Sequence, residues 1–257
     1  MAYAKINSVT NANMAKVNNS AKAALGKIGS IDAPSSFANE YSLSFDGTDD
    51  YVDIGDVTIL DGATEFTISF WINFGALPSA YGAAQHVISK GAAFTISIHN
   101  INSSGGGPGI TVPGTVAIAG YTLSTSTWYH MAVTMVSGGF NTYINGALES
   151  PANQGSGVTI ANVNTPITIA AKNMVGSEPS GFVNAIIDEV AIFDATRDLS
   201  EIQAIYNSGT PTDLSDEDDL VGYWRMEENT GTTVADSSSN SNEGTLTNSP
   251  TWSSSTP

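Results

Sequence analysis

The segment FTISFWINF, residues 66–74, constrains the fold more than any other stretch of the sequence. Its apolar residues at alternate positions are Phe66, Ile68, Phe70, Ile72 and Phe74. Successive side chains of a β-strand point to opposite faces of the sheet, so this period of two predicts one buried face and one polar face that carries a single aromatic residue. We therefore expect a strand that presents its apolar face to a core.

Similar short apolar runs occur along the chain and are separated by turn residues. They are YSLSF at 41, FTISIH at 94, TVAIA at 115, WYHMAVTMV at 128, ITIAA at 167 and FVNAIIDEVAIF at 182. Asn145-Gly146 stands between two apolar arms, which is a strong hairpin signal because both central positions of the favoured turn need positive φ. Many short strands with Gly- and Ser-rich connections predict an antiparallel sandwich or barrel.

One helix is predicted among the strands, in LSEIQAIYNSG at residues 199–209. Ser200 and Gln203 have the spacing of a capping box, and Gly209 is suited to end the helix. One face of this helix would carry Ile202, Ile205 and Tyr206, and we expect that face to pack on the sandwich. The acidic run at 213–219 predicts a solvated linker, because like charges repel one another.

Several motifs between residues 40 and 207 resemble the laminin G-like branch of the concanavalin A-like lectin and glucanase superfamily. They are, in order, YSLSFDGTDDYVDIGD, FTISFWINF, TWYHMAVTM with YINGAL, and IIDEVAIFDATRDLSEIQAIYN. The resemblance implies a jelly-roll sandwich of two curved antiparallel sheets. It also implies that a structural calcium ion and a carbohydrate-binding surface are common among such domains.

The C-terminal segment, residues 214–257, resembles the stretch that usually opens such a domain. It contains LVGYWRMEENTGTTVADSSSNSNEGTLTNSPTWSS, which in the relatives precedes the SLSFDG strand. We interpret this order as a circular permutation, in which strands around Tyr223–Met226 and Gly244–Thr247 complete the same sandwich. A disordered Ser/Asn tail and donation of these strands to a neighbouring copy are the alternatives.

A repeat with a period of eleven residues occupies residues 1–31. It aligns the Lys-aliphatic pairs Lys5-Ile6, Lys16-Val17 and Lys27-Ile28. Four of the eight Lys and Arg residues lie in this segment and none of the 25 Asp and Glu residues do, so it carries +4 while the remaining 226 residues carry −21. We expect an anchor segment, separate from a laminin G-like domain at 32–257. The period fits helical packing and the Asn content fits extended strands, so both conformations remain open.

The composition excludes several classes of partner. The acidic body is unsuited to nucleic acid, because a phosphate backbone needs a basic face and only Lys90, Lys172, Arg197 and Arg225 remain there. The chain has no cysteine, which excludes disulfides and thiolate metal sites. No apolar run approaches the roughly 20 residues of a membrane span. We therefore expect neither nucleic acid nor a membrane as partner.

The carboxylates do not show the pattern of a glycoside hydrolase, which needs two of them about 5–9.5 Å apart. Asp188 and Glu189 are the nearest match, but neighbours on a regular strand point to opposite faces. We therefore expect no catalytic residues and no enzymatic activity. The three histidines, His86, His99 and His130, lack the spacing of metal ligands, and we expect His130 to be a hydrogen-bonded structural residue.

A structural calcium ion is the candidate cofactor, because an acidic sandwich offers the oxygen ligands that this ion prefers; the alternative is that the acidic residues only solvate turns. In the relatives, a carboxylate matched here by Asp188 binds the ion together with carbonyls from the loop after the first strand. Asp46, Asp49 and Asp50 occupy that loop. A carbohydrate site would need exposed aromatic rings that stack on sugars, and the candidates are Tyr81, Tyr121 and Trp71. The alternative is that each of these rings packs within the fold.

The Lys-Ile-Asn modules resemble the N-termini of structural proteins from tailed bacteriophages. We therefore expect a virion structural protein, as a capsid decoration or a component of a tail or fibre, located on the particle surface with a lectin-like domain displayed outward. The expected partners are other virion proteins bound through residues 1–31, further copies in a homo-oligomer, and a host-surface glycan. A free carbohydrate-binding lectin is the alternative from another class, and a glycoside hydrolase is the third.

Overall fold

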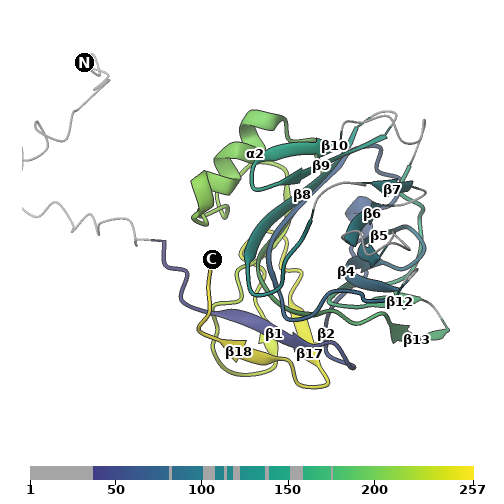
Figure 1. Ribbon diagram of the computed structural model, residues 1–257. Helices are drawn as coiled ribbons and strands as arrows, with labels where there is room; N and C mark the ends of the chain where they lie inside the picture. The colour runs from purple at the N-terminus through teal and green to yellow at the C-terminus, as the bar shows by residue number, and fades with distance from the viewer. Residues whose placement is uncertain are drawn as a thin grey trace, which may run out of the picture. The chain divides into compact units, whose positions relative to one another are not determined.

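Two antiparallel β-sheets face one another in the computed structural model of the chain, as predicted for a jelly-roll sandwich (Figure 1). The structure describes residues 37–80, 83–100, 108–112, 115–117, 122–136, 139–150, 159–174 and 176–257. Residues Asn39–Pro257 form one compact unit. The predicted anchor residues Lys5, Ile6, Lys16, Val17, Lys27 and Ile28 lie outside the described residues, so the anchor stays a prediction.

We call the first sheet sheet A. Its strands, in spatial order, are β10 (Ala147–Ser150), β9 (Gly139–Ile144), β8 (Trp128–Val136), β3 (Phe66–Phe74), β14 (Asn184–Phe193), β1 (Ser42–Asp46) and β18 (Thr251–Ser253). An eighth strand, β15 (Leu220–Trp224), also pairs with β14. The strand predicted from FTISFWINF is thus β3, and it lies in the middle of this sheet.

We call the second sheet sheet B. Its strands, in spatial order, are β16 (Thr233–Val234), β17 (Gly244–Thr247), β2 (Tyr51–Gly55), β11 (Ile167–Ile169), β4 (Ala84–Lys90), β5 (Phe94–Asn100), β6 (Pro108–Val112) and β7 (Thr115–Ala117). A separate hairpin consists of β12 (Lys172–Met174) and β13 (Ser177–Ser180). Two 3-10 turns, η1 (Thr58–Leu60) and η2 (Asn207–Gly209), complete the described elements.

The main core lies between the two sheets and consists of the alternate residues that the sequence pattern predicts. Sheet A contributes fully buried side chains such as Ile68, Phe70 and Ile192, and sheet B contributes Val52 and Ile96 among others. Burial of apolar surface at about 25 cal/mol per Å² is the dominant stabilising contribution in such a core.

The C-terminal segment supplies strands to both sheets of its own chain. β15 pairs with β14 and β18 pairs with β1 in sheet A, while β17 pairs with β2 in sheet B. Trp224, Met226 and Val234 are fully buried in the main core. This arrangement disagrees with a disordered tail and agrees with the strands expected from a permuted segment.

A second, smaller core lies on the outer face of sheet A, beneath the helix α2 (Leu199–Tyr206) (Figure 1). Ile202 and Ile205 of the helix pack there with Tyr223 of β15. Leu214 belongs to the same cluster and is only 3% exposed, so it holds this loop against the sheet. The acidic residues of the run at 213–219 are all exposed, as predicted for a solvated segment.

Both ends of α2 differ from the sequence prediction. The capping box is formed by Asp198, which accepts hydrogen bonds from the backbone of Ser200 and Glu201, while the Glu201 side chain accepts from the backbone of Asp198. The prediction of Ser200 with Gln203 was therefore wrong by two residues. At the other end, Asn207 in the left-handed conformation caps the helix instead of Gly209.

The hairpin signal at Asn145-Gly146 is confirmed. β9 and β10 pair across this turn, and the two residues have φ values of 50° and 72°. A Cβ on Gly146 would approach the Tyr206 ring to 2.8 Å, so the glycine also permits the close approach of α2. In the described part of the chain, no helix is both long and apolar enough to cross a membrane.

Candidate functional site

A break in strand pairing at the centre of β14 creates the most unusual group of side chains. On one side of β14, β1 pairs with residues up to Ile187, and β15 pairs from Val190 onward. On the other side, the register with β3 shifts between Asp188 and Ala191, which is a β-bulge. Asp188 and Glu189 are the two residues at this interruption.

The bulge places two adjacent carboxylates together. Glu189 has φ 49°, a left-handed conformation that is uncommon for a residue other than glycine. One carboxylate oxygen from each of Asp188, Glu189 and Glu227 lies within 4.8 Å of those of the other two. We call these three residues the acidic cluster. The expectation that Asp188 and Glu189 point to opposite faces was wrong, because the alternation of a regular strand does not continue through a bulge.

The carboxylates of β14 are almost completely buried, since Asp188 is 0% and Glu189 3% exposed. Burial, followed by the negative charge of Glu189, raises the pKa of Asp188 well above its usual range. Burial raises the pKa of Glu189 to about 8, although the Tyr223 hydroxyl and Arg225 oppose the shift. Oδ2 of Asp188 accepts no hydrogen bond of ordinary geometry from the described residues, although the Asn39 side chain lies close enough to Asp188 to lower its pKa. A buried, unpartnered carboxylate oxygen is costly unless a proton or a cation compensates it.

The remaining contacts of the acidic cluster come from the C-terminal segment and the residues before β1. The Tyr223 hydroxyl donates to Oε2 of Glu189, and Nε of Arg225 lies 3.8 Å from its Oε1. Glu227 accepts hydrogen bonds from the backbone N–H of Glu40, at 2.9 and 3.0 Å, and of Tyr41, at 3.2 Å. The cluster is thus assembled from three segments that are far apart in the sequence.

The chemistry of the acidic cluster fits a calcium ion. Hard cations bind carboxylate oxygens, and three carboxylates supply up to six of the six to eight oxygen ligands that calcium takes. The unpartnered Oδ2 of Asp188 is one such free ligand atom. The residues present therefore fit the ion that the resemblance implies, with Asp188, Glu189 and Glu227 as the residues that would hold it.

The ligand set expected from the sequence is only partly brought together. Asp46 pairs with Asn184, four residues before Asp188 on β14, which is about 13 Å at the rise of a strand. Asp46, Asp49 and Asp50 form a group of their own in the β1–β2 loop, where Asp46 and Asp49 are exposed. The prediction that Asp188 shares one metal site with Asp46, Asp49 and Asp50 was therefore wrong. The structure has two separate acidic groups, one around Asp188 and one in the β1–β2 loop. The backbone carbonyls of Asp46 and Asp49 already accept hydrogen bonds from Asn184 and Asn248.

Glu189 and Glu227 were missed by the sequence reasoning. One signal for Glu189 is present in IIDEVAIF, because the core residues Ile187 and Val190 are three positions apart whereas Val190 and Ile192 are two apart. This change of phase indicates an extra residue in the strand. No local pattern marks Glu227, since its role depends on the pairing of β15 with β14.

The predicted glycan-stacking residues do not form a platform in the described structure. Trp71 is only 4% exposed, and its ring stacks on that of Tyr206 at 5.8 Å, so the prediction of an exposed Trp71 was wrong. The helix α2 covers it because its aromatic Tyr206 faces the sheet. Tyr81 and Tyr121 lie outside the described residues and stay predictions.

His130 is a structural histidine, as expected. It is fully buried, and its Nε2 lies 2.8 Å from Oγ of Ser69. Its ring lies 5.2 Å from that of Trp71. Burial lowers the pKa of His130 to about 3, so the ring is neutral over the physiological range.

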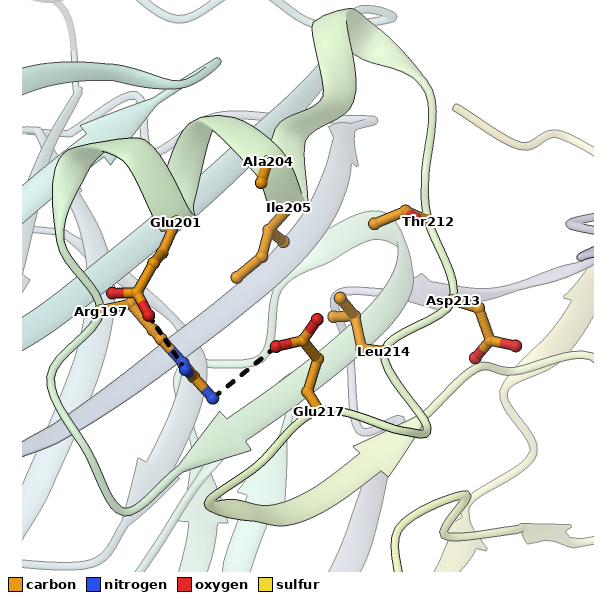
Figure 2. A pocket seen from close by; sticks show the side chains of 8 residues that line it. All are labelled: Arg197, Glu201, Ala204, Ile205, Thr212, Asp213, Leu214 and Glu217. Carbon is orange, nitrogen blue, oxygen red and sulfur yellow. Dashed lines mark hydrogen bonds and ion pairs between the residues drawn. The ribbon is translucent and has the colours of Figure 1, made fainter. Parts of the chain in front are cut away.

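A pocket of about 290 Å³ opens between α2 and the loop that follows it (Figure 2). Arg197 and Glu201 line it from the start of the helix, and Asp213 and Glu217 line it from the loop. Its apolar lining consists of Ala204, Ile205 and Leu214. Nη1 of Arg197 lies 3.1 Å from Oε1 of Glu201, and its Nη2 lies 4.0 Å from Oε2 of Glu217. We call this the Arg197 pocket.

Comparison with known proteins identifies the fold family. A family model described as the concanavalin A-like lectin/glucanases superfamily matches residues 46–203, which is more than half of the chain. The chain belongs to this superfamily. The match ends before the C-terminal strands that complete the sandwich here. No curated protein sequence matches the chain.

Solved structures of the same architecture come from distant members. A protein of Bacteroides ovatus, described as carbohydrate-binding, has a TM-score of 0.65 at 15% identity and covers 84% of this chain, whereas this chain covers only 60% of that protein. A heptameric SAP-like pentraxin from Limulus polyphemus has a TM-score of 0.51 at 15% identity, with 65% of this chain and 82% of that chain covered. At such identities the likeness concerns the fold of the superfamily alone.

Proposed function

We propose that this protein is a virion structural protein that displays a non-catalytic, glycan-binding domain on the surface of the particle. The glycan-binding part is supported by membership in the lectin/glucanase superfamily and by the likeness to the Bacteroides ovatus protein described as carbohydrate-binding.

The observation that favours binding over hydrolysis is the burial of the acidic cluster. A glycosidase brings two carboxylates to either side of a glycosidic bond, so both must reach the substrate. Asp188 and Glu189 are 0% and 3% exposed, and the Tyr223 hydroxyl and the main chain of the Glu40 segment occupy the space around the cluster. This geometry suits a structural ion and leaves no room for a sugar between the carboxylates.

The virion part of the proposal is supported by the amino-terminal sequence. The three Lys-aliphatic modules resemble virion proteins of tailed phages, and half of the basic residues lie before residue 32. A +4 segment joined to a −21 body suits an anchor that binds an acidic partner while the bodies repel one another. The proposed partners are other virion proteins, bound through residues 1–31, and further copies of the chain in a homo-oligomer.

Two measurements test the two parts separately. The full chain, applied to a glycan array, should bind a defined set of glycans, and binding to none of them would refute the glycan-binding part. Purified particles should contain the intact protein at a fixed, stoichiometric copy number. A protein that binds glycans but is absent from particles would be a free lectin, which refutes the virion part alone.

The anchor is tested by a chain that begins at Asp32. We expect it to fold and to bind glycans like the full chain, but to be missing from particles, because the binding segment has been removed. Binding of the full chain to particles stripped of the protein should weaken as salt rises, since exposed charges are screened over about 8–10 Å near physiological ionic strength. Incorporation of the shortened chain at full copy number would refute the anchor.

A further inference from the structure

The Arg197 pocket contains a buried side chain whose donors the fold uses only in part. Arg197 is only 9% exposed, and its guanidinium lies over the ring of Phe193, 4.5 Å from the ring centroid. Nη2 donates to the carbonyl of Asp218 and Nη1 donates to Glu201. Nε, in contrast, has no hydrogen-bond partner among the described residues. Nε itself has almost no accessible surface, so a ligand cannot reach it. The two terminal nitrogens carry four N–H groups, of which the bonds to Asp218 and Glu201 use two, and Arg197 lines the pocket, so a ligand with a hydroxyl or carbonyl oxygen can accept from the remaining ones.

Acceptors face the same space. The carboxylates of Glu201 and Glu217 approach Arg197 from the helix and from the loop (Figure 2). Their side chains are 43% and 49% exposed. Oε2 of Glu201 already accepts from the backbone N–H of Asp198, whereas Oε1 of Glu217 makes no contact with Arg197 and is open to a ligand. Ionised carboxylates only accept hydrogen bonds, and a sugar hydroxyl can both donate to them and accept from the terminal N–H groups of Arg197.

The floor of the pocket is apolar. Ile205 and Leu214 are 7% and 3% exposed and belong to the small core beneath the helix. A few polar groups around an apolar surface are the usual composition of a small-molecule site, and a volume of about 290 Å³ lies at the lower end of the range for such sites. One sugar ring presents the matching combination, with hydroxyls at its edge and C–H groups on its faces.

The net charge of the residues that line the Arg197 pocket determines whether it favours anionic, neutral or cationic sugars. One positive side chain, Arg197, and three negative ones, Glu201, Asp213 and Glu217, give a net charge of −2. The whole chain carries −17, so an anionic ligand would be repelled at both short and long range. A cationic ligand would be attracted to the free carboxylate oxygens.

We propose that the Arg197 pocket binds a sugar residue without negative charge, and that it prefers an amino sugar, whose ammonium group pairs with Glu217 while its hydroxyls contact Arg197 and Glu201. This inference rests on the proposed glycan-binding function and assigns its site and sugar class. Sialic acids and uronic acids are excluded by the same charges.

The test uses the full chain and three probes of equal length, which are oligomers of glucosamine, glucose and galacturonic acid. Titration calorimetry at low salt should give the highest affinity for the glucosamine oligomer, a lower one for the glucose oligomer, and none for the galacturonate oligomer. The preference for glucosamine should shrink in 0.5 M salt, because the charges are exposed.

The Glu217→Gln variant should lower the affinity for the glucosamine oligomer roughly fivefold and change that for the glucose oligomer less, which is the scale of one exposed ion pair. Glu217 contacts Arg197 only at 4.0 Å, so the fold should survive, and an unchanged melting temperature verifies this. Glu65→Gln removes the same charge from an exposed residue outside the pocket and should leave all affinities unchanged.

Each other outcome refutes a specific statement. If the protein binds glycans but Glu217→Gln binds like the wild type, the pocket is not the site and the proposed function stands. If the protein binds array glycans but the galacturonate oligomer binds best, the assigned sugar class is wrong. If a Lys-rich peptide binds the pocket and no glycan binds the protein, the proposed function and this inference both fail.

Discussion

The two faces of sheet A are both buried, but they are buried in different ways. On the inner face, apolar side chains such as Phe70 and Ile192 pack against the other sheet, and each has many equivalent neighbours. On the outer face, polar groups such as Ser69, His130 and Asp188 lie beneath the helix and the C-terminal segment. Each inner-face side chain packs against several apolar side chains of the same core. Each outer-face polar or aromatic side chain is covered by a particular residue from a distant part of the chain, as Tyr206 covers Trp71.

The largest loss of stability should come from deleting the C-terminal segment, because its residues pack on both faces of sheet A. A chain that ends at Asp213 loses β15 to β18 and the fully buried Trp224 and Met226. Truncating one buried Trp costs about 3–5 kcal/mol, and domain stability totals only about 5–15 kcal/mol, so we expect no cooperative thermal transition by circular dichroism. The chain that begins at Asp32 is the control and should melt like the full chain. Normal melting of the C-terminal truncation would contradict the role of these strands.

Neighbouring residues of β3 allow a direct comparison of the faces. Phe70→Ala on the inner face should reduce the free energy of unfolding by about 3–5 kcal/mol through lost burial and a cavity. Ser69→Ala on the outer face removes the hydrogen-bond partner of His130 and should cost about 1–3 kcal/mol. Urea denaturation measures both values. Equal costs would mean that the two faces do not differ as described.

Calcium should raise the stability of the protein through the outer face alone, because the proposed ion would bind at Asp188 on that face. At a hundredfold excess over its dissociation constant, the ion should stabilise the protein by about 2.7 kcal/mol, seen as a rise in melting temperature. Asp188→Asn should melt higher than the wild type in chelator at neutral pH, because burial raises the pKa of Asp188 and the wild type must take up a proton at this carboxyl on folding. The variant should not respond to calcium. Asp46→Asn is the matched control in the other acidic group. A response lost in Asp46→Asn but kept in Asp188→Asn would move the ion to the β1–β2 loop.

The smallest effect should appear as a pH dependence of the outer face. The pKa of His130 is lowered to about 3 in the folded protein, against about 6.5 unfolded, so the unfolded state binds more protons below pH 6.5. Stability that is present above pH 6.5 is therefore lost as the pH falls, by about 1 kcal/mol between pH 6.5 and 5.5. His130→Gln should lose less over this interval, measured as the difference in unfolding free energy. An identical loss in both proteins would mean that another group causes the acid sensitivity.

The sequence predicted the inner face well and the outer face poorly, for a physical reason. Alternation in FTISFWINF reports burial against a sheet directly, because it is a local property of one strand. Trp71 lies on the polar-looking face of the same strand, and nothing nearby in the sequence reveals that Tyr206 will cover it. The helix itself was found, but its cap was misplaced, because Asp198 and Ser200 are both good capping residues.

The acidic cluster shows the same limit. Asp188 was identified through the resemblance, whereas Glu189 joins it only through a bulge and Glu227 only through long-range strand pairing. The bulge leaves a trace in the spacing of Ile187 and Val190. The partnership with Glu227 leaves none, since Glu227 is anchored to the backbone of Glu40, 187 positions away.

The pairing of β1 with β18 has a mechanical consequence. Ser42, the first residue of β1, lies opposite Ser253, the last residue of β18, so the chain enters and leaves this pair of strands at the same end. A force pulling those two points apart would load the inter-strand hydrogen bonds one after another, as in a zipper, and would not shear them together. The domain should therefore yield at low force when stretched between its ends, and resist more when pulled through a ligand held elsewhere on its surface.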